Sequence, residues 1–312
     1  MRIIFFGTPP IAADILRFLI ENRCNIVGIV SRPDRPKGRS LKTTPTAVKI
    51  CAKQLAPEVP IFQPEKASSS EMADQLKALK PDLFIVVAYG EIIKQNLLDV
   101  PKLMPVNIHM SLLPKYRGAA PIERVLMNGE NETGVTIIEM VLKMDAGDIL
   151  HVEKVKIEED MTKEKLTSLL TARARSAIKI VIEQGSKGKI QKISQDASQV
   201  TFAPKILPEE GLISFNQSAQ NIHNKVRALS PKPGAYTFIE VDGCKKRLKV
   251  LTTKVLQDQT GEPGQILSLK KQFIVACQSG SLQILSLQPE GKKAMPAKDF
   301  LSGIYKKIIF VS

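Results

Sequence analysis

Residues 1–30 constrain the fold more than any other stretch of this chain. Residues 3–6 form an apolar run typical of a buried strand, and the two prolines after the Gly-Thr turn suit the start of a helix. That helix should run to about Asn22, and a second apolar run at residues 25–30 predicts the next strand. A strand, a helix and a strand in this order indicate a Rossmann-like α/β fold. Because Gly7 is not followed by the other glycines of the dinucleotide fingerprint, the fold is expected without NAD.

Two polar residues alternate within an apolar strand farther along the chain. Residues 106–109 have the composition of a short buried strand, and alternation sends Asn107 and His109 to the same face. An amide and an imidazole side by side can donate hydrogen bonds to a developing oxyanion, and the imidazole can also transfer a proton near neutral pH. Ser111 lacks the Gly-x-Ser-x-Gly turn that would expose it as a nucleophile. The pattern favours direct transfer between two bound substrates.

The surroundings of His109 decide between this interpretation and a simpler one. A lone histidine at a strand end is more often a hydrogen-bonded structural residue than a catalytic one. Residues 117–121, however, have little bulk, as expected where a ligand or a second chain lies close to the backbone. Residues 144–149 form a tight acidic turn between apolar segments, from which Asp145 could orient the imidazole. We therefore expect an active site at residues 106–121.

Several of these pieces together resemble a known family. The NIHxSLLP stretch, the RGAAP that follows it and the later MDAGDI are similar to the folate-dependent formyltransferases. With the opening RIIFFGTP and the segments PDRPKGR, VVAYGEII, ETGVTI and LQPEGKKAM, nearly the whole chain resembles the methionyl-tRNA formyltransferases. The order and spacing of these pieces make the resemblance specific.

The resemblance implies an activity and a set of site residues. The enzyme would move the formyl group of 10-formyltetrahydrofolate to the α-amino group of methionyl initiator tRNA, giving N-formylmethionyl-tRNA for translation initiation. Asn107, His109 and Asp145 would be catalytic, and no metal would be needed. The residues expected to bind the folate are Ser111, Leu112, Leu113, Pro114, Tyr89 and Gly90.

Positive charge sets this chain apart from an ordinary soluble protein. The net charge is +14 over 312 residues, which most often means an anionic partner such as nucleic acid, although a merely solvated basic surface is the alternative. The 11 Phe and 4 Tyr are scattered, there is no Trp, and no aromatic stacking stripe is evident. An RNA partner should therefore be bound through its backbone charge and shape.

Residues 31–49 concentrate part of this charge. The segment is rich in Lys, Arg and Pro and has a single Asp, which predicts a loop. From composition alone, a solvated connector and a recognition loop are equal alternatives. The resemblance favours recognition, because the tRNA formyltransferases carry an inserted basic loop here that reaches the acceptor stem. The loop residues expected to bind tRNA are Arg35, Lys37, Arg39 and Lys42.

Periodicity and turn signals divide the chain into two domains. A Rossmann-like catalytic domain is expected at residues 1–188 and a linker at residues 189–207. Residues 208–312 alternate short apolar runs with Gly-containing turn signals, the pattern of a small β-barrel. In the resembling family this part is an OB-like barrel that binds tRNA, and here it holds roughly half of the net charge. Further elements expected in the first domain are helices at 71–80, 91–98 and 163–184, and strands at 83–87, 134–140 and 149–157.

Cysteine usage and the N-terminus indicate the compartment. Cys24, Cys51, Cys244 and Cys277 fit neither a zinc spacing nor a disulfide framework, so we expect reduced thiols and no metal. The opening apolar run is too short for a signal peptide, and no run approaches the length of a membrane span. The chain is expected to act in the cytoplasm, without a membrane partner and as a monomer.

Two rival functions use the same residues differently. A formyltransferase acting on a small amine, such as a purine precursor or an amino sugar nucleotide, would share the NIH and DAGD residues, but the basic loop and basic second domain argue against it. A catalytically idle RNA-binding protein on this scaffold would be expected to lose its polar residues. Because Asn107, His109 and Asp145 are all present, the enzyme is favoured.

Overall fold

The computed structural model describes residues 1–312 except 38–41, 242, 270–271, 303–308 and 312. The chain divides into two compact units. The N-terminal unit consists of Met1–Gly118, Glu132–Val155 and Thr167–Ala203, and the C-terminal unit of Ala119–Asn131, Lys156–Leu166 and Pro204–Ser312.

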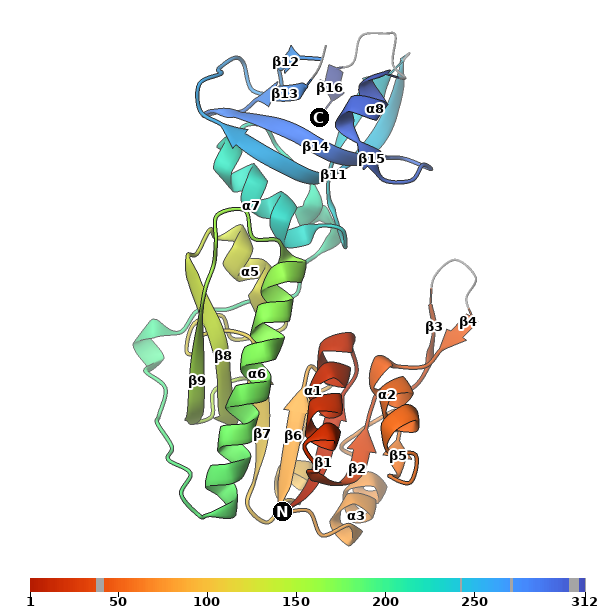
Figure 1. The fold of residues 1–312 in the computed structure, drawn as a ribbon, viewed down its shortest axis with the longest axis vertical. Helices are drawn as coiled ribbons and strands as arrows, with labels where there is room; N and C mark the ends of the chain where they lie inside the picture. The colour runs from red at the N-terminus through yellow and green to blue at the C-terminus, as the bar shows by residue number, and fades with distance from the viewer. Residues whose placement is uncertain (38–41, 242, 270–271, 303–308, 312) are drawn as a thin grey trace. The chain divides into compact units, whose positions relative to one another are not determined.

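The described residues of the N-terminal unit form a seven-stranded sheet in the order β5-β2-β1-β6-β7-β8-β9 (Figure 1). The pairings from β5 to β7 are parallel, and β8 is antiparallel to β7. This mostly parallel sheet confirms the Rossmann-like expectation. Its strands are β1 (Arg2–Gly7), β2 (Asn25–Val30), β5 (Ile61–Phe62), β6 (Leu83–Val87), β7 (Met104–His109), β8 (Glu132–Glu139) and β9 (Ile149–Lys156).

Helices cover both faces of this sheet because its central strands are apolar on both sides. Alternate residues of β1, Ile4 and Phe6, pack with Met72, Leu76 and Leu97 of two helices in one buried cluster. Figure 1 shows two other helices, α1 and α6, in front of the sheet. The helices of this unit are α1 (Pro10–Glu21), α2 (Ala47–Leu55), α3 (Ser70–Ala78), α4 (Gln95–Leu98) and α6 (Lys163–Ser186).

The expected helix at residues 91–98 is largely wrong. Only Gln95–Leu98 is helical, because the chain leaves β6 through two residues with left-handed backbone angles, Ala88 (φ 44°) and Gly90 (φ 87°). Glu91 then accepts a hydrogen bond from the backbone N of Ala67 at 2.9 Å. This contact holds residues 88–91 as an irregular segment at the carboxyl end of β6.

The basic segment at residues 31–49 is more ordered than the loop that its composition predicts. Strand β3 (Arg35–Lys37) pairs antiparallel with β4 (Lys42–Thr44), and Arg35 lies opposite Thr44. Helix α2 begins before the segment ends, because the Thr46 side chain caps it by accepting from the backbone N of Lys49 at 3.1 Å. Arg39 lies outside the described residues.

The described residues of the C-terminal unit form a second seven-stranded, barrel-like sheet. Its printed pairings are all antiparallel, in the order β12-β13-β14-β11-β10-β16, with β15 against β14. One of its glycine turns joins β13 to β14, where Gly280 has a left-handed φ of 70°. The strands are β10 (Ala235–Val241), β11 (Cys244–Leu256), β12 (Ile266–Ser268), β13 (Phe273–Ala276), β14 (Ser281–Pro289), β15 (Met295–Pro296) and β16 (Ile309–Val311).

A helix that the turn signals did not indicate packs into this sheet. Helix α7 (Ala219–Leu229) begins at Ser218, whose side chain accepts from the backbone N of Asn221 at 3.1 Å. Its buried residues Ile222 and Val226 join the core cluster of the unit. The unit also contains helices α5 (Pro121–Met127) and α8 (Ala297–Ser302). Among the described residues, no helix has both the length and the apolar character that crossing a bilayer requires.

Candidate active site and RNA interface

The candidate site lies at the carboxyl end of β7, where a mostly parallel sheet usually binds its ligands. Strand β7 is flanked by β6 and β8, with Asn107 opposite Val86 and Ile138. Alternation along β7 brings Asn107 and His109 to the same carboxylate, as the sequence predicted. His109 is buried, with 5% of its surface exposed.

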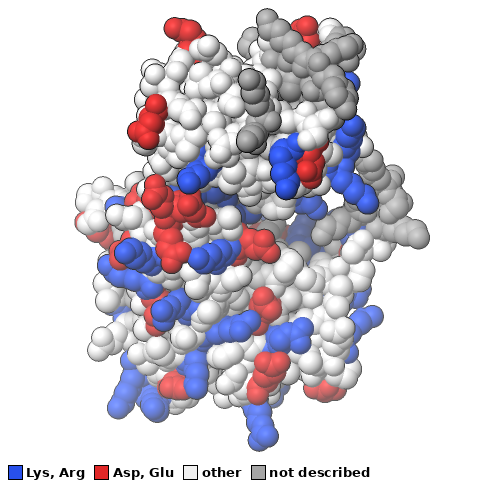
Figure 2. Space-filling view, turned by 45° about the horizontal axis from the view of Figure 1, so that its top comes forward, with Lys and Arg blue, Asp and Glu red and all other residues white. Residues whose placement is uncertain are grey.

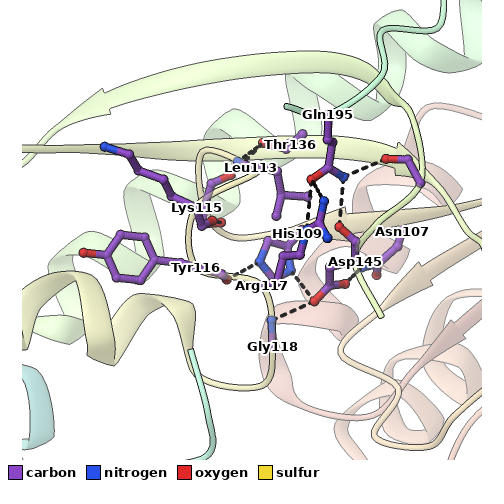
Figure 3. A network of polar contacts seen from close by, with 12 residues as sticks. Asn107, His109, Leu113, Lys115, Tyr116, Arg117, Gly118, Thr136, Asp145 and Gln195 are labelled. Carbon is purple, nitrogen blue, oxygen red and sulfur yellow. Dashed lines mark hydrogen bonds and ion pairs between the residues drawn. The ribbon is translucent and has the colours of Figure 1, made fainter. Parts of the chain in front are cut away.

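That carboxylate belongs to Asp145, which joins the two β7 side chains to a neighbouring loop (Figure 3). Asn107 Nδ2 donates to Asp145 Oδ1 at 3.2 Å, and the backbone N of Gly118 donates to Oδ2 at 2.8 Å. His109 Nδ1 lies 3.6 Å from the same Oδ2. Asp145 has a left-handed backbone angle (φ 51°), a conformation that Asp tolerates better than most residues. The structure therefore brings the three residues expected to be catalytic into one cluster.

The other ring nitrogen fixes the tautomer of His109. Nε2 lies 2.8 Å from the carbonyl oxygen of Tyr116. Because a carbonyl oxygen can only accept, Nε2 must carry a hydrogen and donate it. The neutral ring therefore presents an unprotonated Nδ1 toward Asp145, and this nitrogen can take up a proton.

Burial makes the cluster suited to stabilising charge. The side chains of His109 and Asp145 are only 6% and 11% exposed. The Asn107 amide has two N–H groups, and a single one of them is needed for Asp145 Oδ1. Donors fixed in a site with little water stabilise a developing oxyanion far more than they would in bulk solvent. The arrangement can hold an oxyanion and accept a proton.

The residues expected to line a folate site directly after β7 form a tight turn. Ser111 is fully buried, and its Oγ donates to the carbonyl of Lys115 at 2.8 Å. Thr136 Oγ1 of β8 donates to the Ser111 carbonyl at 2.7 Å and accepts from the backbone N of Leu113 at 3.1 Å. The Ser111 hydroxyl thus closes the turn, consistent with its exclusion as a nucleophile. Leu112 and Pro114 are half-buried beside it, and their contact with folate stays a prediction.

Tyr89 and Gly90 contribute differently to the edge of the sheet. The Tyr89 ring is 2% exposed and packs edge-on against Phe6, with centroids 5.6 Å apart. Burial of its hydroxyl raises the pKa of Tyr89 to about 12. Gly90 is exposed, as is Ala88. The backbone of this segment, rather than the tyrosine ring, can therefore contact a ligand.

Sequence reasoning missed a polar residue beside the cluster, Gln195, in the segment expected to be a linker. Its side chain donates to the carbonyls of Asp145 and Gly147 and accepts from the Arg117 guanidinium (Figure 3). Contacts to main-chain carbonyls leave no pattern in a sequence. The low apolar content around Gln195 indicated a linker instead.

The residues expected to bind tRNA fall into three structural situations. Arg35 is exposed and forms an ion pair with Glu65. Lys37 and Lys42 lie opposite each other in the β3–β4 ladder. Arg39 is outside the described residues. Basic side chains are spread over the face shown in Figure 2 with acidic ones among them, so net charge alone does not locate an RNA interface.

One surface of the C-terminal unit combines cations with aromatic rings, an arrangement that the scattered aromatic residues of the sequence did not indicate. Arg247 lies over the Tyr236 ring, 3.7 Å from its centroid, and Lys245 Nζ lies 4.8 Å from the centroid of Phe238. Lys249 pairs with Tyr236 across β10 and β11, which completes a row of alternate residues on one side of the sheet. We call this set the aromatic–basic strip: Tyr236, Phe238, Lys245, Arg247 and Lys249.

No group of three or more His, Cys, Asp or Glu side chains able to hold a metal occurs among the described residues. The four cysteines are not paired as disulfides. Catalysis without a metal stays a prediction.

Comparisons with known proteins identify the family. Residues 1–182 match the formyl transferase family model and residues 205–305 match the formyl transferase C-terminal domain. A methionyl-tRNA formyltransferase of Protochlamydia amoebophila is 46% identical, over 98% of this chain and 96% of the relative. Those of Geobacter sulfurreducens and Chlamydia caviae are 41% and 39% identical over 97% of this chain and 94% and 95% of theirs.

Solved structures share the fold at lower identity. The sugar 3N-formyl transferase WlaRD is 18% identical with a TM-score of 0.67, and the match covers 94% of this chain and 99% of that one. HypX from Aquifex aeolicus, solved with tetrahydrofolic acid, is 20% identical with a TM-score of 0.65 over the full length of this chain, which spans about half of HypX. The resemblance noted in the sequence is thus confirmed, and the chain belongs to the methionyl-tRNA formyltransferase family of folate-dependent formyltransferases.

Proposed function

We propose that this chain transfers the formyl group of 10-formyltetrahydrofolate to the α-amino group of methionyl initiator tRNA. One observation carries the proposal: a cluster of buried His109 with half-buried Asn107 and Asp145, in a chain that matches methionyl-tRNA formyltransferases over nearly its whole length. Solved structures of related fold under 25% identity support the architecture alone. They do not favour a small amine as the acceptor.

The cluster supports a direct transfer without a covalent enzyme intermediate. The neutral amine of the methionyl group attacks the formyl carbon, and the formyl oxygen becomes an oxyanion. The second N–H of Asn107 and a protonated Nδ1 of His109 would donate to that oxygen. The bond between the formyl carbon and the folate nitrogen then breaks, and the proton lost by the amine ends on that nitrogen.

Asp145 has two tasks in this scheme. Its Oδ2 lies 3.6 Å from His109 Nδ1, so the carboxylate would set the orientation of the ring. The same carboxylate accepts from Gly118 N, which fixes its own position. Asp145 and His109 together would relay the amine proton toward the leaving folate.

Binding of the two substrates is assigned to different segments. The folate would contact the turn from Ser111 to Pro114 and the exposed backbone near Tyr89 and Gly90. The tRNA would contact Arg35, Lys37, Arg39 and Lys42 of the basic segment at residues 31–49, and the aromatic–basic strip of the C-terminal unit. Lys245 and Arg247 of the strip lie over aromatic rings, which orient their charged groups.

We retain the domain division at residues 1–188, 189–207 and 208–312 as part of this proposal. We also propose that the chain works as a monomer in the cytoplasm, where translation initiates, and not at a membrane.

The test is formylation of purified methionyl initiator tRNA with a formyl-folate donor. Hydrolysis of the product should release formyl-methionine. Elongator methionyl-tRNA and free methionine, supplied at the same concentration, should be poor acceptors. Equal formylation of free amines would contradict the proposal.

A further inference from the structure

The turn that carries Asp145 is held at its two ends by different contacts. Gly147 packs so closely against β8 that a Cβ there would lie 1.8 Å from the carbonyl oxygen of Glu139. The backbone N of Glu139 also donates to the carbonyl of Asp148 at 3.0 Å. The β8 side of the turn is therefore fixed by main-chain packing. Asp145 itself, in its left-handed conformation, needs a separate restraint.

Gln195 supplies that restraint. Its Nε2 donates to the carbonyl of Asp145 at 2.9 Å and to the carbonyl of Gly147 at 2.7 Å. Its Oε1 accepts from Arg117 Nε at 3.1 Å and Nη2 at 2.7 Å. A guanidinium only donates and a carbonyl only accepts, so the chemistry of the neighbours permits one orientation of the Gln195 amide.

Within the part of the chain that the structure describes, the buried guanidinium of Arg117 has an amide, and not a carboxylate, as its side-chain partner. It is 6% exposed, and among the described residues no carboxylate forms an ion pair with it. Its main chain is fixed as well, because its N donates to the carbonyl of Thr201 at 2.9 Å and its carbonyl accepts from Ala203 N at 2.7 Å. Arg117 thus offers Gln195 a rigid anchor.

The contacts close a ring through the candidate active site. Arg117 binds Gln195, Gln195 binds the main chain of Asp145, and the Asp145 side chain binds the N of Gly118, the residue next to Arg117 (Figure 3). Displacement of Gln195 would free the turn at Asp145. The carboxylate would then no longer be held at its present distances from Gly118 N and His109 Nδ1.

We propose that Gln195 is a positioning residue of the transfer reaction, holding the Asp145 carboxylate in register with His109 through two hydrogen bonds to the turn. This inference rests on the proposed function. It gives residues 189–203, which the sequence indicated as a linker, a part in forming the active site. A displaced Asp145 should slow turnover while both substrates still bind, because small misplacements of a catalytic group are costly in rate.

Two substitutions separate this role from a role in neutralising Arg117. Gln195→Ala removes all four contacts. Gln195→Glu keeps the shape and can form an ion pair with Arg117, but it replaces the two donors by an oxygen that faces two carbonyl oxygens. Gln199→Ala is the matched control, because Gln199 is exposed in the same segment and its side chain donates to Asp196.

We expect both Gln195 variants to lose about tenfold or more in kcat, with KM for folate and for methionyl-tRNA changed by less than about twofold. The control should match the wild type. Amide exchange of Gly118 should become faster in both Gln195 variants, since Asp145 Oδ2 is its acceptor. Amide exchange of Gly118 is measured without substrate, so it tests the positioning role even if the wild type does not formylate methionyl-tRNA.

Four kinetic or exchange results would overturn the inference. They are wild-type kcat in Gln195→Ala, full activity in Gln195→Glu, a raised KM with unchanged kcat, and unchanged Gly118 exchange in the folded variants. If both variants lose their fold by circular dichroism, Gln195 has a structural role and the inference is equally overturned.

Discussion

Removal of the cations of the aromatic–basic strip should change how tRNA binding depends on salt. Lys245, Arg247 and Lys249 alternate along β11, so the Cα atoms of neighbouring members are about 6.8 Å apart. That interval is close to the separation of successive phosphates in a nucleic-acid strand. The proposed triple replacement by Ala therefore removes three phosphate contacts at once.

The size of the effect follows from counterion release. Each phosphate contact contributes about 0.9 to the slope of log affinity against log salt on a duplex and about 0.7 on a single strand. Three contacts contribute about 2.1 to 2.7 in total. Between about 50 and 200 mM salt, the wild type should therefore lose about twentyfold to fortyfold more affinity than the triple variant.

The assay is filter binding of methionyl-tRNA across this salt range. A control variant replaces Lys246, Lys293 and Lys298 by Ala, with the same loss of charge. All three are exposed, and alternation places Lys246 on the side of β11 opposite the strip. An equal loss of slope in both variants, or no loss in the strip variant, would refute the reasoning, because binding would then depend on total charge alone.

Further predictions concern the cluster, the basic segment at residues 31–49 and a buried histidine. His109→Ala and Asn107→Ala should each slow single-turnover formylation by about a hundredfold or more, with modest changes in substrate affinity. Asp145→Asn should resemble His109→Ala. If any of the three variants kept full turnover at saturating substrates, the replaced residue would have no catalytic role. Replacement of Arg35, Lys37, Arg39 and Lys42 together by Ala should lower single-turnover formylation at saturating tRNA, while the folate affinity measured by fluorescence stays unchanged. Unchanged formylation would mean that the segment at residues 31–49 is a solvated connector. Burial lowers the pKa of His223, which is 4% exposed. Below about pH 6.5, the histidine is therefore protonated more readily in the unfolded state than in the folded state. Because the unfolded state binds more protons, the free energy of unfolding should fall as the pH drops from about 6.5 to 5. Urea titrations should show a smaller fall for His223→Gln, and an equal fall would contradict the assignment.

Local patterns predicted the site wherever the sheet itself positions a residue. Asn107 and His109 lie two residues apart on β7, and strand alternation was enough to bring both to one side. Asp145 was indicated by the acidic turn and by family resemblance. Neither source indicated its contact with Gly118 N, which depends on how two loops meet.

Contacts between segments far apart in the sequence were missed. Gln195 is 50 residues from Asp145, and it acts on carbonyl groups that every residue possesses. Helix α7 was overlooked although Ile222 and Val226 have the spacing of an amphipathic helix, because the glycine turns of the barrel dominated the pattern. The expected helix at residues 91–98 failed since propensity does not reveal the left-handed backbone at Ala88 and Gly90.

The central claim is that this chain formylates the amine of methionine only when it is esterified to initiator tRNA. The most direct measurement supplies radiolabelled 10-formyltetrahydrofolate together with methionyl initiator tRNA and an excess of small amines, including an amino sugar nucleotide. Our account predicts that the label appears as formyl-methionine after hydrolysis of the tRNA, and that it is absent with His109→Ala. Label on a small amine with none on the tRNA would contradict it.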